Sequence, residues 1–79
     1  MSTTLAEAAT RLRRAALAVE NTDSRVTAFD RAATELDRLG FFRTDVALAV
    51  AELLDAAPGS PNETHAEAVA VRILTGAGK

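Results

Sequence analysis

The chain has 79 residues, a formal net charge of −2 from nine basic and eleven acidic side chains, and no cysteine. This length predicts one domain, and the lack of cysteine excludes disulfides, thiolate metal sites and cysteine nucleophiles. The near balance of charge argues against a general affinity for nucleic acid or an anionic membrane. The start of the chain does not resemble a signal peptide, and apolar runs stop far short of the ~20 residues that span a bilayer. We therefore expect a soluble, cytoplasmic protein.

Alanine dominates the apolar residues, because 18 of the 38 hydrophobic side chains are alanine. Arginine supplies eight of the nine basic residues, and this composition suggests a GC-rich gene of bacterial or phage origin. A chain below about 80 residues rarely gains more than ~3–5 kcal/mol from one core. Oligomerisation or a partner would supply further burial. A compact monomer with close, alanine-mediated helix packing is the alternative.

The first predicted helix spans residues 5–19, where apolar side chains recur three or four positions apart. Arg13 and Arg14 lie away from this apolar stripe, together with Arg11. Leu17 also falls outside the stripe, which makes it a candidate for a second contact.

The second predicted helix spans residues 24–39 and has one apolar face and one face of mixed charge. Gly40 follows in the position of a helix-ending glycine, and Phe41 is expected to pack back on the last turn. Phe42 has no such structural task in the pattern. It is therefore either a plug at the end of the bundle or an exposed anchor for a partner.

The third predicted helix, residues 45–57, is the most apolar stretch of the chain, and Thr44 or Asp45 is expected to cap it. A strand is rejected because the alternating residues are alanines, which favour helices. Valines and leucines form one broad face, at positions 46, 50, 53 and 54, beside a strip of Ala47 and Ala51 that would let another helix approach closely. Leu48 falls near the polar side. We expect this helix to be the most buried of the chain.

The fourth predicted helix spans residues 61–75, with Ser60 as its cap and Val71 outside its main apolar stripe. Short links favour antiparallel neighbours. The sequence therefore predicts an all-α fold, a small bundle of four short helices within one domain, residues 1–79. An up-and-down arrangement is the simplest, and steeper crossings are the alternative.

Residues suited to chemistry are few. His65 is the only histidine, and no second histidine or cysteine completes a zinc-like set. There is no glycine-rich phosphate loop and no serine elbow, and the serines occupy expected end or cap positions. We predict no catalytic residues, no metal, no cofactor and no small-molecule substrate, and hence no enzyme.

Contact with protein is the favoured interpretation, either with another protein or with a second copy of the chain as a homo-oligomer. The mechanism would be burial of an apolar patch with an arginine-containing rim. The candidate contact residues are Phe41, Phe42, Leu48, Leu17 and Val71, with Arg13, Arg14 and Arg43 as rim charges.

A small DNA-binding or transcription-regulating protein is the alternative function. Residues 32–53 fit a helix-turn-helix spacing, but the would-be recognition helix carries three acidic residues and no basic one. An arginine-rich first helix would be the better surface for nucleic acid. No membrane contact is predicted.

Overall fold

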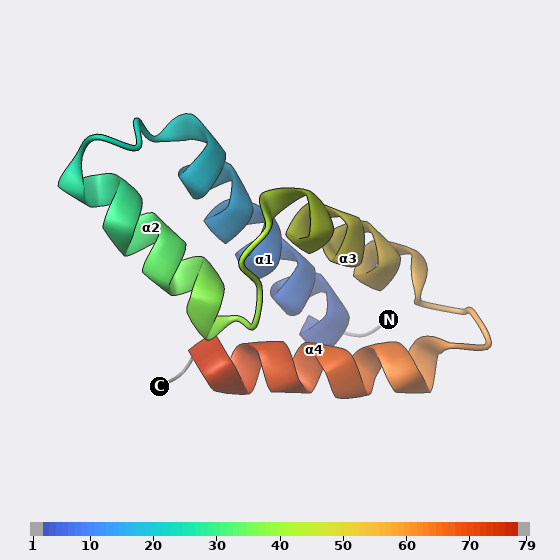
Figure 1. The fold of residues 1–79 in the computed structure, drawn as a ribbon. Coiled ribbons are helices and arrows are strands. Elements are labelled where there is room, and N and C mark those ends of the chain that lie inside the picture. The colour runs from blue at the N-terminus through green and yellow to red at the C-terminus, as the bar shows by residue number, and fades with distance from the viewer. Residues whose placement is uncertain (1–2, 78–79) are drawn as a thin grey trace.

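Four helices joined by short turns make up residues 3–77, the part of the chain that the computed structural model describes (Figure 1). They are α1 (Thr3–Asn21), α2 (Thr27–Arg38), α3 (Thr44–Ala56) and α4 (Glu63–Ala77). The prediction of a small all-α bundle is confirmed. No helix end lies more than three residues from its predicted position.

The centre of the fold is α1, because each of the other three helices packs against it. Six residues of α1 are buried, against three of α3. The expectation that the third helix is the most buried is therefore wrong. The buried apolar residues among those described are Leu5, Ala8, Ala9, Leu12, Ala15, Ala16, Leu36, Leu39, Ala47, Ala51, Leu54, Ala57, Ala70 and Ile73.

Alanine determines how α3 lies on α1. Eight of the fourteen buried residues are alanine, and Ala47 and Ala51 of α3 are fully covered. The most extensive contact between two helices is that of α1 with α3. Small side chains let two helix backbones approach closely, which increases the dispersion contacts between them. We call this contact of Ala47 and Ala51 with α1 the alanine seam. The predicted alanine strip is thus the face that packs on α1.

The valine and leucine face of α3 is consequently turned partly outward. Val46 is 42% exposed and Leu53 is 68% exposed, whereas Leu54 is buried. On the other side of the helix, Leu48 is partly buried and packs against the core. The outer and inner sides of α3 are therefore only partly those that the sequence predicts: Leu54 and Val50 pack inward as expected, whereas Val46 and Leu53 do not.

The end of α2 has the geometry expected from Gly40. This residue has φ +97°, its N–H donates to the carbonyl of Asp37 (2.9 Å), and the N–H of Phe41 donates to the carbonyl of Leu36 (3.2 Å). These two bonds are those of a Schellman motif. Phe41 is partly buried against the core, as predicted, and the chain turns here toward α3.

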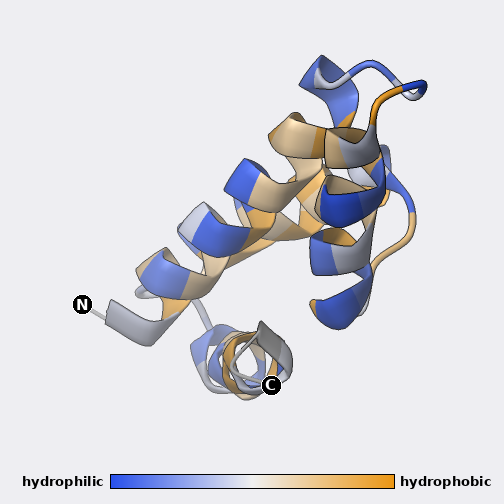
Figure 2. Cartoon of the chain, turned by 90° about the vertical axis from the view of Figure 1, so that its left-hand side faces the viewer, coloured by the Kyte–Doolittle hydropathy of each residue, from blue (hydrophilic) through white to orange (hydrophobic). Residues whose placement is uncertain are grey.

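The α4 helix crosses the other helices steeply. Figure 1 shows it running beneath them, and Figure 2 views it nearly end-on while α1 is seen from the side. Ala70 and Ile73 are its buried residues. Near its end, a Cβ at Gly76 would lie 2.5 Å from the carbonyl oxygen of Arg38, so the backbones of α4 and α2 approach closely there.

The N-terminal caps predicted for α3 and α4 differ from those in the structure. Arg43 is the N-cap of α3, with extended backbone and no side-chain cap, so neither Thr44 nor Asp45 caps the helix. Before α4, the Ser60 hydroxyl oxygen accepts the N–H of Asn62 (3.3 Å), and the helix begins only at Glu63. The turn 57–62 therefore takes up two residues that the pattern assigned to the helix.

Candidate functional site

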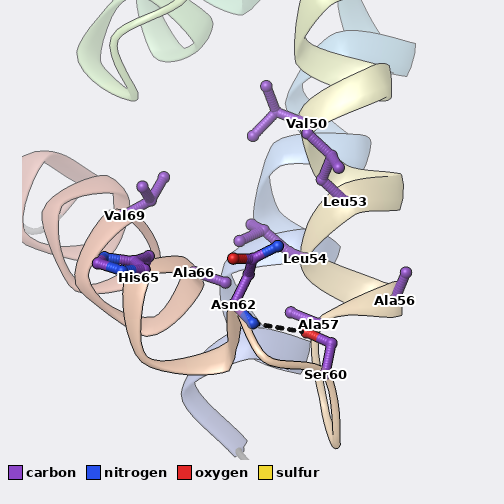
Figure 3. A pocket seen from close by; sticks show the side chains of 10 residues that line it. All are labelled: Val50, Leu53, Leu54, Ala56, Ala57, Ser60, Asn62, His65, Ala66 and Val69. Atoms are coloured by element: carbon purple, nitrogen blue, oxygen red, sulfur yellow. Dashed lines mark hydrogen bonds between the residues drawn. The ribbon is translucent and has the colours of Figure 1, made fainter.

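An apolar groove lies between α3 and α4. It has a volume of about 480 Å³. Figure 3 shows Val50 and Leu53 of α3 on one side, with Val69 and Ala66 of α4 on the other. The lining residues are Val50, Leu53, Leu54, Ala56, Ala57, Ser60, Asn62, His65, Ala66 and Val69.

The groove is open because α3 and α4 both rest on α1 but barely contact each other. The alanine seam holds α3 on α1, and α4 runs at a steep angle, so it diverges from α3 (Figure 1). Leu53 (68% exposed) and Val69 (44% exposed) are left on the two walls. Covering these apolar side chains with another molecule lowers the free energy by about 25 cal/mol per Å² of buried apolar area.

Polar groups in the groove are few and lie toward one end. Ser60 and Asn62 come from the turn and are hydrogen-bonded to each other, and His65 stands on the first turn of α4 (Figure 3). Among residues 3–77, no three His, Asp or Glu side chains gather where they could hold a metal ion. The lining is therefore mainly apolar, with three polar residues at one end.

None of the eight residues predicted to make contacts lines this groove. Phe42 is 88% exposed in the link between α2 and α3, and Leu17 (41%) and Val71 (52%) are exposed on α1 and α4. Phe41 and Leu48 instead lie partly buried against the core. The exposed members come from three separate segments, and no described pocket gathers them.

Two of the three predicted rim arginines already have carboxylate partners within the chain. Arg13 on α1 forms an ion pair with Asp55 on α3, which adds a polar tie to the alanine seam. Arg43 donates two hydrogen bonds to Asp45, at 3.1 and 2.6 Å, and these hold the pKa of the Asp45 carboxyl below its usual value. Arg14 is exposed and forms no ion pair with a described residue.

The sequence pattern does not indicate that the groove residues are exposed, because their spacing is typical of a buried face. Val50, Leu53 and Leu54 were assigned to one face, yet only Leu54 is fully covered. The signal that could have separated them is the alanine strip. A helix that docks through Ala47 and Ala51 turns the neighbouring bulky residues away from the closest contact.

Comparison with protein-family models, curated proteins and solved structures finds no match to this chain. Within residues 3–77, none of the helices combines the length and the apolar character that crossing a bilayer requires.

Proposed function

We propose that this protein is a small non-enzymatic interaction module whose contact surface is the α3–α4 groove. The observation that carries the proposal is Leu53, a large apolar side chain 68% exposed on the wall of an open apolar groove. Single exposed apolar residues are common on protein surfaces, but an apolar concavity with exposed walls is typical of a binding site.

The composition of the core supports the same function. Eight of its fourteen buried residues are alanines, which bury little area each. A partner that covers Leu53, Val69 and Val46 would bury large apolar side chains that stay exposed in the folded chain. Phe42, Leu17 and Val71 remain predicted contacts outside the groove.

Nucleic acid is less well supported as a partner. Arg13 pairs with Asp55, and Arg11 lies 4.0 Å from a carboxylate oxygen of Glu35. These carboxylates offset much of the positive charge that would attract phosphates to α1. The cytoplasmic location stays a prediction.

A photo-activated cross-linking residue placed at Leu53 in the native host tests the proposal. The same residue at Ala28, which is exposed on α2, is the matched control. We expect a discrete adduct from position 53 and none from position 28. Absence of any adduct from position 53 would reject the groove as a contact surface, and mass spectrometry of an adduct identifies the bound chain.

A further inference from the structure

We infer that α4 is a movable wall of the groove: it detaches from α1, α2 and α3 as one unit, about the turn 57–62, while those three helices stay packed together. The detachment itself does not depend on the proposed function. Its consequence for binding does, because the groove exists only while α4 is docked and supplies the wall that contains Ala66 and Val69 (Figure 3).

Few apolar side chains hold α4 in place. Between residues 63 and 76, Ala70 and Ile73 are the buried residues, and Ala66 and Leu74 pack partly buried against the core. The α4 helix packs mainly on α1 and barely contacts α3 or α2. Since burial of apolar area supplies most of the free energy that docks a helix, the free energy needed to detach α4 is small.

Polar contacts do not add to this docking. Among residues 3–77, no side-chain hydrogen bond or ion pair joins α4 to another helix. The Glu63 carboxylate accepts the N–H of Gly59 (3.5 Å), which lies in the preceding turn. By contrast, the ion pair of Arg13 with Asp55 joins α1 to α3. The described contacts of α4 with α1 therefore rest on apolar packing.

The turn 57–62 allows the movement because its hydrogen bonds are local. The Ser60 N–H donates to the carbonyl of Ala57 (2.9 Å), and the N–H of Glu63 donates to the carbonyl of Ser60 (3.2 Å). Gly59 has φ +81°, and no atom lies within 4 Å of a Cβ added there. These bonds stay between the last residue of the α3 end and the first residue of α4, so the turn can change direction without losing a partner on another helix.

The α2 helix is also thinly buried, through Leu36 and Leu39, but it is held at both ends. One turn joins it to α1, and the Schellman motif at Gly40 leads into α3. Detaching α2 while α1 and α3 stay together requires both of these connections to rearrange. Detaching α4 requires only the turn 57–62, because the other three helices all precede it.

The position of α4 thus determines whether the proposed contact surface is present. A partner that contacts both walls binds only the docked state, and a molecule that binds one of two states raises the population of that state. Binding in the groove and docking of α4 should therefore stabilise each other.

Hydrogen exchange of single backbone amides, followed by NMR under conditions where the rate reports the opening equilibrium, tests the inference. After correction for intrinsic rates, the amides of residues 68–74 should exchange about tenfold faster or more than the most protected amides of α1 and α3. Low concentrations of urea should speed exchange of residues 68–74 less steeply, since detachment of one helix exposes less surface than global unfolding.

Two variants of similar expected size separate detachment of α4 from global unfolding. Ile73→Val weakens the docking of α4 and should speed exchange of residues 68–74 about fivefold. Ala47→Gly weakens α3 within the alanine seam, which stays intact when α4 detaches. It should therefore speed the most protected amides of α1 and α3 about fivefold and leave residues 68–74 unchanged.

The inference is overturned if residues 68–74 exchange with the same opening equilibrium as the most protected amides of α1 and α3, or if Ala47→Gly speeds both sets equally. Either result leaves a Leu53 adduct, and with it the proposed function, standing. Absence of the Leu53 adduct rejects the groove as a contact surface and does not alter the exchange pattern of α4.

Discussion

Leu53 and Leu54 are neighbours on α3 whose truncation to alanine should affect stability very unequally. Leu54 is 2% exposed within the core, and Leu53 is 68% exposed on the groove wall. Removing a buried leucine side chain costs about 2–5 kcal/mol. A 79-residue domain has a total stability of about 4–12 kcal/mol, and an alanine-rich core favours the lower end. Leu54→Ala should therefore remove about half of the stability or more.

Leu53→Ala should change stability by no more than about 0.5 kcal/mol, because little covered surface is lost and alanine favours the helix. Urea unfolding followed by helical circular dichroism measures both variants. Dilute protein is used so that association does not add to stability. A loss of more than about 2 kcal/mol for Leu53→Ala, or near-equal losses for the two variants, would refute the orientation of α3 described above.

Three further outcomes follow from local geometry. Ala51→Leu should cost about 1–3 kcal/mol by overfilling the seam with α1, whereas Ala49→Leu, at an exposed position of the same helix, should change urea stability little. Gly40→Ala should cost about 1–2 kcal/mol in the same assay, since φ is +97° while no atom lies within 4 Å of the added Cβ; an unchanged midpoint would contradict this. The stability that Asp45 gains from Arg43 should be present above the ordinary aspartate pKa of 3.8 and be lost as pH falls through the lowered folded-state pKa. Acid titration of Arg43→Ala should therefore show a shallower loss than the wild type, and identical acid profiles would argue against the pairing.

The helices could be predicted from the sequence because their signals are local. Apolar spacing located all four helices, and the Gly40–Phe41 pair gave the correct end of α2. These features depend on residues only a few positions apart, so no knowledge of the tertiary fold is needed.

The groove could not be predicted because it depends on how α3 is rotated on α1. Bulky residues usually define the buried face of a helix, and that rule assigned Leu53 to the interior and Leu48 to the exterior. In the structure Leu53 is 68% exposed and Leu48 packs partly buried against the core, since the inner side of the helix is formed by the fully covered Ala47 and Ala51. Spacing along one helix cannot decide between an alanine seam and a leucine face, because the choice depends on the alanines that α1 presents.

The central claim is that the α3–α4 groove is open, with Leu53 exposed on its α3 wall. The absence of native cysteine allows a direct measurement, the rate at which a thiol reagent modifies Leu53→Cys in dilute protein. Leu17→Cys, exposed on α1, is the control. The account predicts that position 53 is modified about as fast as position 17. Modification of position 53 many times slower than that of position 17 would contradict it.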